Sequence, residues 1–187
     1  IKRNEIILDV GSGSGDIASE ILREGLPTSL YLLDLNKEML LEGKKRLKKE
    51  KNIKYFIGNA EKLNFADNFF DKYSVSFCLR NVTEYILSLK EAYRVLKPGG
   101  KYCCLEFSTP KSSLISSSYK VYKSKILPLL GDIVARDKNA YKYLSESIDL
   151  FPSQEELSNN LIDCGFTKVK TINLFNGIVA IHTGYKI

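Results

Sequence analysis

The chain has 187 residues, of which 44% are hydrophobic, and a formal net charge of +6. This length fits one globular domain with a substantial core, and no apolar run approaches the roughly 18 residues of a membrane-spanning helix. The basic excess suits nucleic acid, an anionic membrane surface or an acidic substrate, and it does not choose among them.

The sequence gives no sign of a metal site. Its four cysteines form no Cys-x-x-Cys pair and no cluster with the single histidine, which argues against zinc. We therefore expect no bound metal, reduced thiols and a cytoplasmic location. Because the chain begins at Ile1, we expect the native N-terminal segment to be missing, and a lost organellar targeting signal stays open.

Short apolar runs alternate with helical periodicity over the first 107 residues. Strands are predicted at residues 5–10, 29–33, 53–57, 72–77 and 101–107, and helices at 16–23, 36–47 and 87–96. Asn36 is a suitable N-cap for the second helix, and Pro98 and Gly99 end the third. This alternation implies right-handed βαβ crossovers and a parallel sheet.

The C-terminal part breaks the alternation. Residues 167–174 and 177–185 are predicted to be two strands joined tightly through Asn176-Gly177, which is a hairpin signal. Residues 108–150 are too long for a βα loop and too apolar for disorder, so we expect a helical insertion that packs over the active site. The prediction is one α/β domain over residues 1–187. Its Rossmann-like, mostly parallel seven-stranded sheet ends in an antiparallel hairpin, with the insertion before the last helix, as in class I methyltransferases.

Three glycines follow the first predicted strand and open the first helix: Gly11, Gly13 and Gly15. Glycine there lets the backbone turn sharply and approach a ligand closely. The dinucleotide-binding pattern Gly-x-Gly-x-x-Gly would have its third glycine at Asp16. A carboxylate opposes a pyrophosphate but suits S-adenosylmethionine, which has no phosphate and carries a sulfonium and an ammonium. The loop therefore favours the methyl donor over NAD.

Polar residues follow the next three predicted strands. Asp34 lies about 20 residues beyond the glycines, where such folds place the acid that binds the ribose hydroxyls; its alternative role is a helix N-cap. Asn59 is positioned to hydrogen-bond adenine, although an ordinary polar turn explains it equally well. Ser76 is predicted to line the cofactor site. Arg80 and Asn81 are predicted to face an acceptor, with a surface salt bridge as the alternative for Arg80.

Several longer strings resemble the ubiquinone/menaquinone biosynthesis C-methyltransferase family. They are Asn59-Ala60-Glu61, Leu79-Arg80-Asn81-Val82-Thr83, Leu105-Glu106-Phe107-Ser108, and residues 93–100, 141–148 and 179–186. The resemblance covers essentially the whole chain, and its most specific parts are 79–83, 141–148 and the ending. It implies that the donor site includes Ser14, Asp34, Asn59, Ala60 and Ser76, with serine at position 14 where the family more often has threonine.

The resemblance also implies transfer of a methyl group from S-adenosylmethionine to a ring carbon of a polyprenylated benzoquinol or of demethylmenaquinol. A quinol becomes an electron-rich carbon nucleophile when its hydroxyl loses a proton. Arg80 is predicted to stabilise the phenolate and Asn81 to orient the ring oxygens. Tyr141 and Tyr143 are candidate acceptor-pocket residues, with helix packing as the alternative, and His182 is assigned a structural role in the hairpin.

The expected partner is the polyprenylated quinol, whose tail resides in membrane. We therefore expect peripheral contact with the inner face of the membrane through basic and aromatic residues of the insertion, such as Lys120 and Tyr122. A homodimer or a biosynthetic assembly is also expected. Nucleic acid is not, because no Asp/Asn-Pro-Pro-Tyr/Phe motif follows the fourth strand. A methyltransferase of another lipophilic small molecule, such as a sterol, and a non-catalytic donor-binding scaffold remain as alternatives.

Overall fold

The computed structural model describes residues 4–25, 29–108 and 138–187. Its strands are β1 (Ile6–Val10), β2 (Ser29–Asp34), β3 (Ile53–Ile57), β4 (Phe70–Ser76), β5 (Leu96–Phe107), β6 (Thr167–Leu174) and β7 (Val179–Tyr185). Its helices are α1 (Asp16–Glu24), α2 (Lys37–Arg46), α3 (Tyr85–Val95), α6 (Lys138–Leu150) and α7 (Gln154–Asp163), with short 3-10 turns η1 (Leu79–Asn81) and η4 (Phe175–Gly177).

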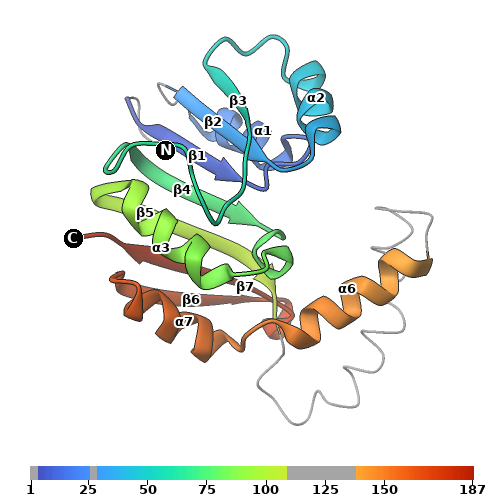
Figure 1. Cartoon of the computed structure of the whole chain (residues 1–187), viewed down its shortest axis with the longest axis vertical. Coiled ribbons are helices and arrows are strands. Elements are labelled where there is room, and N and C mark those ends of the chain that lie inside the picture. The colour runs from blue at the N-terminus through green and yellow to red at the C-terminus, as the bar shows by residue number, and fades with distance from the viewer. Residues whose placement is uncertain (1–3, 26–28, 109–137) are drawn as a thin grey trace.

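The seven strands form one sheet in the order β3-β2-β1-β4-β5-β7-β6 (Figure 1). The first five run parallel, and β7 pairs antiparallel with both β5 and β6. The predicted α/β fold with an antiparallel end is confirmed. The hairpin turn is confirmed as well, since Asn176 and Gly177 both have positive φ angles, of 57° and 88°.

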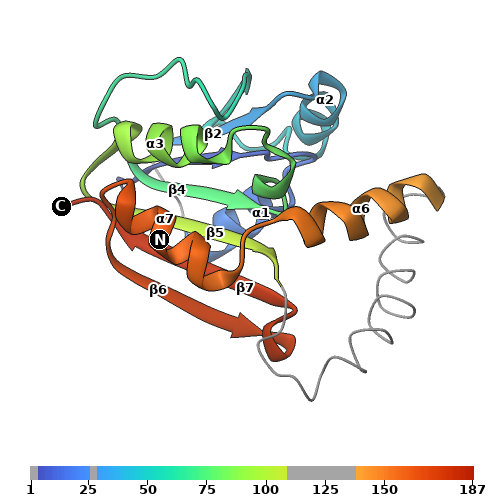
Figure 2. The ribbon, with the colours of Figure 1, turned by 60° about the horizontal axis from the view of Figure 1, so that its bottom comes forward.

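Helices cover both faces of the sheet, with α3 and α7 on one face and α1 on the other (Figures 1 and 2). Side chains of β1 alternate accordingly. Ile7 packs in a cluster with residues of α1 and α2, whereas Leu8 and Val10 join the larger cluster that contains residues of α3 and α7. The sequence of β1 is therefore apolar almost throughout because both of its faces are buried.

The helix after β4 ends differently from the prediction. Val95 is the last helical residue, and β5 begins at once with Leu96, which pairs with Phe70 at the start of β4. Both side chains are fully buried. Burial of this pair extends each strand towards its amino end, and the Pro98-Gly99 segment becomes an irregularity inside β5 instead of a separate loop.

The described part of the predicted insertion is its last portion, the helix α6. It contacts η1, and the Tyr143 hydroxyl donates a hydrogen bond of 3.1 Å to Asn81 Oδ1. The basic and aromatic surface predicted around Lys120 lies outside the described residues. Within the described residues, no helix is long and apolar enough to cross a membrane.

Candidate active site

The glycine turn after β1 has a backbone that requires glycine. Gly11, Gly13 and Gly15 have φ angles of 64°, 52° and 81°, which L side chains rarely adopt. A Cβ atom on Gly11 would lie only 2.2 Å from Cys78 Sγ. The absence of a side chain at Gly11 therefore lets the turn after β1 lie directly against the turn after β4.

Asp34, the last residue of β2, ties this turn in place. Its Oδ2 accepts a hydrogen bond of 2.8 Å from the Gly13 amide, and its Oδ1 accepts one of 2.8 Å from the Asn36 amide. Asn36 itself caps α2, as predicted, because its side chain accepts the Met39 amide. A carboxylate has acceptor sites beyond these two, so Asp34 can still receive hydroxyl protons from a ligand.

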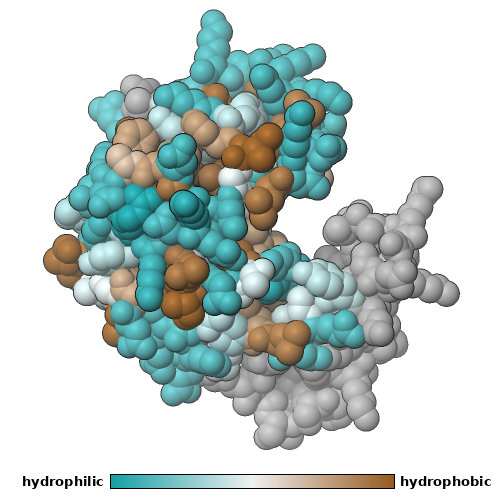
Figure 3. Space-filling model, viewed as in Figure 1, coloured by the Kyte–Doolittle hydropathy of each residue, from teal (hydrophilic) through white to brown (hydrophobic). Residues whose placement is uncertain are grey.

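A pocket of about 380 Å³ opens at the carboxyl ends of four parallel strands. It is lined by Val10 and Gly11 after β1 and by residues 33–35, 58–61, 77–78 and 81–83 from the ends of β2, β3 and β4. Figure 3 shows the molecular surface hollowed on this side, between α2 and α6. The position agrees with the rule that open α/β sheets bind ligands beyond their strand carboxyl ends.

The predicted site residues divide into two groups. Those that line the pocket are Gly11, Asp34, Asn59, Ala60 and Asn81, and those that do not are Gly13, Ser14, Gly15, Ser76, Arg80 and Tyr143. Tyr141 lies in α6, and its side chain is outside the described residues. Gly13 and Ser76 lie within two residues of the lining residues Gly11 and Phe77.

The lining of the pocket has a one-sided charge. Asp34 and Glu61 contribute carboxylates, and among the described residues that line it none carries a positive charge. Such a pocket fits the sulfonium and ammonium of S-adenosylmethionine and does not suit a pyrophosphate. The charge of Asp16, which first indicated this ligand, is instead taken up by an ion pair with Arg46 of α2. The hydrogen bond from Arg46 holds the pKa of Asp16 below its usual value.

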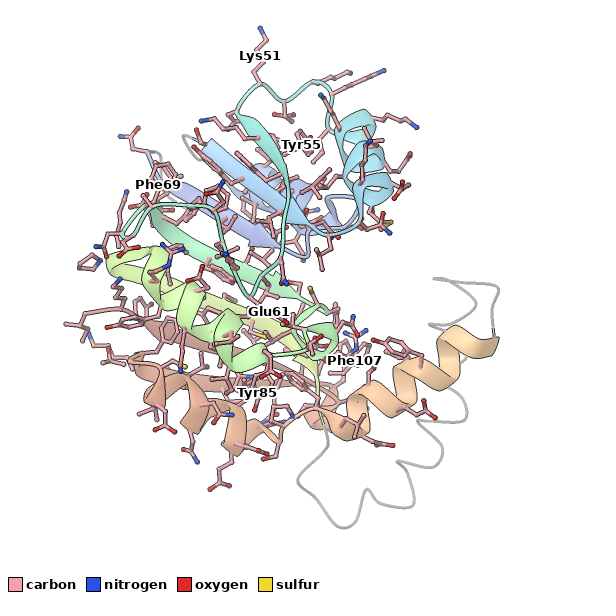
Figure 4. The ribbon with its side chains drawn as sticks, viewed as in Figure 1. Lys51, Tyr55, Glu61, Phe69, Tyr85 and Phe107 are labelled. Atoms are coloured by element: carbon pink, nitrogen blue, oxygen red, sulfur yellow. The ribbon has the colours of Figure 1, made fainter. Side chains whose placement is uncertain are left out.

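The loop after β3 is braced by its own side chains. Asn59 Oδ1 accepts the Glu61 amide at 2.9 Å, and Asn59 Nδ2 donates to Glu61 Oε2 at 3.2 Å. Glu61 Oε1 in turn accepts the Glu84 amide at 2.9 Å, which ties this loop to the start of α3 (Figure 4). Glu61 was not among the predicted site residues, although its position next to Ala60 was a usable signal.

Asp9 is a second acid that the predictions missed. It is 1% exposed, its Oδ1 accepts the Ser74 hydroxyl at 2.6 Å, and its Oδ2 has no hydrogen-bond partner in the described part of the chain. Burial raises the pKa of its carboxyl to about 7. A carboxylate on the residue two positions before Gly11 was the sequence signal for a buried acid behind the pocket.

Arg80 is paired internally and is not a surface residue. Its Nη1 donates to Glu106 Oε1 and to the Phe77 carbonyl, both at 2.7 Å, and the side chains of Arg80 and Glu106 are 10% and 2% exposed. The guanidinium also lies 5.2 Å from the centre of the Phe107 ring, at the end of β5 (Figure 4). Burial raises the pKa of Glu106, and the charge of Arg80 opposes this rise.

One other expectation can be placed. His182 is buried in β7, and its Nε2 forms a hydrogen bond of 3.1 Å with the Gln154 carbonyl, as expected for a structural residue in the hairpin. Burial lowers its pKa. Over residues 4–25, 29–108 and 138–187, no group of three or more His, Cys, Asp or Glu side chains is arranged to hold a metal ion.

Solved structures share this fold. A SAM-dependent methyltransferase from Aquifex aeolicus aligns with all of this chain and 84% of its own, at 17% identity and a TM-score of 0.71. One from Methanosarcina mazei aligns with all of this chain and 94% of its own, at 24% identity and a TM-score of 0.69. Phosphoethanolamine N-methyltransferase 2 from Haemonchus contortus, solved with S-adenosyl-L-methionine, reaches a TM-score of 0.74 at 19% identity, over all of this chain and 49% of its own.

Sequence relatives are much closer. The ubiquinone/menaquinone biosynthesis C-methyltransferase UbiE of Rickettsia bellii (strain RML369-C) is 48% identical over 98% of this chain and 77% of its own length. The enzyme of the same name from Rickettsia prowazekii (strain Madrid E) is 49% identical over the same shares. The model of the ubiE/COQ5 methyltransferase family matches residues 1–186. With this match over nearly every residue, and with an acidic pocket at the place where its fold binds ligands, the chain belongs to the ubiE/COQ5 methyltransferase family.

Proposed function

We propose that this chain transfers a methyl group from S-adenosylmethionine to a ring carbon of a polyprenylated benzoquinol or of demethylmenaquinol. The observation that carries the donor is the pocket lining, which offers two carboxylates and, among described residues, no cation. The acceptor class is supported by the names of relatives that are 48–49% identical over 98% of the chain.

The donor supplies an electrophilic methyl group, and the chain binds and orients it. Asp34 accepts hydroxyl hydrogens of the ribose while it holds the Gly13 amide. Asn59 and Ala60 present the polar edge of the loop after β3 to the adenine. The fixed geometry of both loops lowers the entropy that must be lost to align the methyl group with its acceptor.

On the acceptor side, the residues proposed are Arg80 and Asn81. A phenol has a pKa of about 10, so a quinol needs help to ionise at neutral pH. Because Arg80 Nη1 is committed to Glu106 and Phe77, its remaining N–H groups would meet the phenolate as hydrogen-bond donors. Asn81 lines the pocket and would orient a ring oxygen, with Tyr143 fixing the amide through its hydroxyl. The hydroxyl proton would leave through water to solvent, because arginine is a poor base. The ring carbon that gains the methyl group would then lose its own hydrogen as a proton to solvent, which restores the aromatic ring.

The polyprenyl tail also bears on partners and location. We propose that the protein meets the membrane peripherally, on its cytoplasmic face, to collect an acceptor that resides there, and that it works as a homodimer or within a biosynthetic assembly. Co-sedimentation with liposomes of increasing anionic lipid content tests the first part, and binding that ignores lipid charge would reject a basic contact surface. Sedimentation velocity tests the second part, and a monomer at all concentrations would reject the homodimer.

The decisive experiment is one assay that offers a benzoquinol and a demethylmenaquinol in reduced form with methyl-labelled donor, followed by product mass. Labelled carbon-methylated quinol is expected from at least one class. In a parallel reaction a sterol is offered with the same labelled donor. A labelled, methylated sterol product would favour the alternative lipophilic substrate. Donor binding by calorimetry without turnover of any acceptor would favour a non-catalytic scaffold.

A further inference from the structure

The turn that closes β4 is a strained part of the pocket wall. Phe77 has a φ of 52°, a conformation that is unfavourable for an aromatic residue, and Phe77, Cys78 and Asn81 all line the pocket. Cys78 packs against Gly11, so a shift of this turn would reshape the wall shared with the glycine loop.

The buried carboxylate of Glu106 holds both ends of this turn: it contacts Arg80 directly, and Arg80 in turn contacts Phe77. Glu106 Oε1 accepts Arg80 Nη1, which also donates to the Phe77 carbonyl, and Glu106 Oε2 accepts the Arg80 amide at 3.3 Å. The Phe107 amide adds a third donor, at 2.9 Å to Oε1. So many donors around a side chain that is 2% exposed mark Glu106 as ionised and as the partner of the Arg80 charge.

The charge of Arg80 reaches the pocket wall. Burial is the main reason that the pKa of Cys78 is raised to about 12, and Asp34 and Glu106 raise it further, whereas Arg80 lowers it. The charges of Arg80 and Glu106 therefore shift the pKa of the same pocket-lining thiol, that of Cys78, in opposite directions. An Arg80 cation without Glu106 would present a net positive charge to a pocket whose described lining is otherwise acidic.

We propose that Glu106 is a positioning residue that fixes Arg80 and cancels its charge, so that the pocket can hold a cationic methyl donor beside an arginine. This inference rests on the proposed donor. S-adenosylmethionine carries a net charge of +1, whereas its product S-adenosylhomocysteine has lost the sulfonium charge and is otherwise almost the same molecule. Glu106 therefore keeps the Arg80 charge from repelling the donor, and loss of the Glu106 charge alone should affect the two ligands unequally.

The test is the ratio of the two dissociation constants, Kd for S-adenosylmethionine over Kd for S-adenosylhomocysteine, measured by calorimetry at pH 8. Glu106→Gln keeps the shape of the side chain and removes its charge. We expect the ratio to rise about tenfold, because repulsion between two like charges several ångströms apart in a partly buried site weakens binding by roughly that factor. Arg80→Gln combined with Glu106→Gln removes both charges, and the ratio should return to the wild-type value.

Glu91→Gln is the matched control. Glu91 also pairs with an arginine at 2.7 Å, Arg94, but it lies on α3 and does not line the pocket, so the ratio should not change. Equal weakening of both ligands in Glu106→Gln, or a ratio that stays high in the double variant, would overturn the proposal. Glu106→Ser, with the same charge change, replaces Glu106→Gln if that variant is unstable. If neither single variant folds while the double variant does, Glu106 acts through stability alone and the charge proposal is rejected.

Failure of the proposed donor gives a different result. In that case the wild-type protein would bind neither ligand, and no ratio could be measured. Wild-type binding with an unchanged ratio in Glu106→Gln would reject only the role assigned to Glu106.

Discussion

The buried acid Asp9 makes a quantitative prediction about stability and pH. Folding raises the pKa of its carboxyl from 3.8 to about 7, mainly by burial. Between these values the folded protein holds a proton that the unfolded chain has released. The free energy of unfolding therefore falls as pH rises through this range. The contribution of the protonated Asp9 carboxyl to stability is fully present only below about pH 4.

The size of the effect follows from the shift. Each pKa unit corresponds to about 1.4 kcal/mol, so a shift of about three units amounts to roughly 4 kcal/mol of unfolding free energy between pH 4 and pH 8. Domains are stabilised by only about 5–15 kcal/mol in total. The Asp9 carboxylate is thus expected to be one of the larger destabilising groups in the protein at neutral pH.

Replacement of Asp9 by asparagine isolates this effect. The amide oxygen can still accept the Ser74 hydroxyl, and the side chain no longer titrates. The free energy of unfolding is measured in urea from pH 4.5 to pH 8.5 for both proteins. Stability of Asp9→Asn relative to wild type should rise with pH by about 3 kcal/mol over this range, and then level off above pH 8.

The slope of this difference is the test, because other titrating groups cancel when the two proteins are subtracted. Any fixed cost of burying an asparagine amide shifts the curve without tilting it. Asp163→Asn, the same substitution at an exposed position on α7, is the control. A difference for Asp9→Asn that tilts with pH no more than that of Asp163→Asn would refute the assignment of a raised pKa to the buried acid.

Three further predictions concern the site and its frame. Arg80→Ala should lower kcat at saturating quinol by about 100-fold or more, and normal turnover would reject its catalytic role. Gly11→Ala should destabilise the protein by more than 2 kcal/mol in urea unfolding, since its Cβ would meet Cys78 at 2.2 Å. Gly99→Ala, with positive φ but open space around it, should cost only about 1 kcal/mol, and equal losses would contradict the steric argument. Asn36→Ala should cost about 1 kcal/mol through loss of the α2 cap, measured in the same way, and no loss would mean that the cap is dispensable.

Local sequence signals predicted most of the fold. Apolar runs gave β3 with the bounds that the structure has, Asn36 marked the start of α2, and Asn176-Gly177 marked the terminal hairpin. What they missed depends on tertiary contact. Leu96 becomes a strand residue because it pairs with Phe70, and no pattern within either segment reports that pairing.

The candidate site shows the same difference between local sequence signals and tertiary contacts. Gly11, Asp34 and Asn59 could be predicted to lie at the pocket because they stand at the ends of successive strands. The partner of Arg80 was not, because Glu106 is 26 residues away and reaches it only once β4 and β5 pair. A lone arginine in a sequence offers a free charge, whereas the folded chain shows that this charge is already neutralised.

The chain order of the pocket wall has a consequence for how this enzyme can be altered. The described residues that line the pocket all lie between Val10 and Thr83, and none of them belongs to α6 or to the terminal hairpin. In the described part of the chain beyond Ser108, α6 contacts η1, and the Tyr143 hydroxyl donates a hydrogen bond to Asn81 of the pocket wall. Grafting the chain beyond Ser108 from a relative with another acceptor would therefore exchange α6 and its Tyr143 contact, whereas the described pocket wall, Arg80 and Glu106 are all inherited intact.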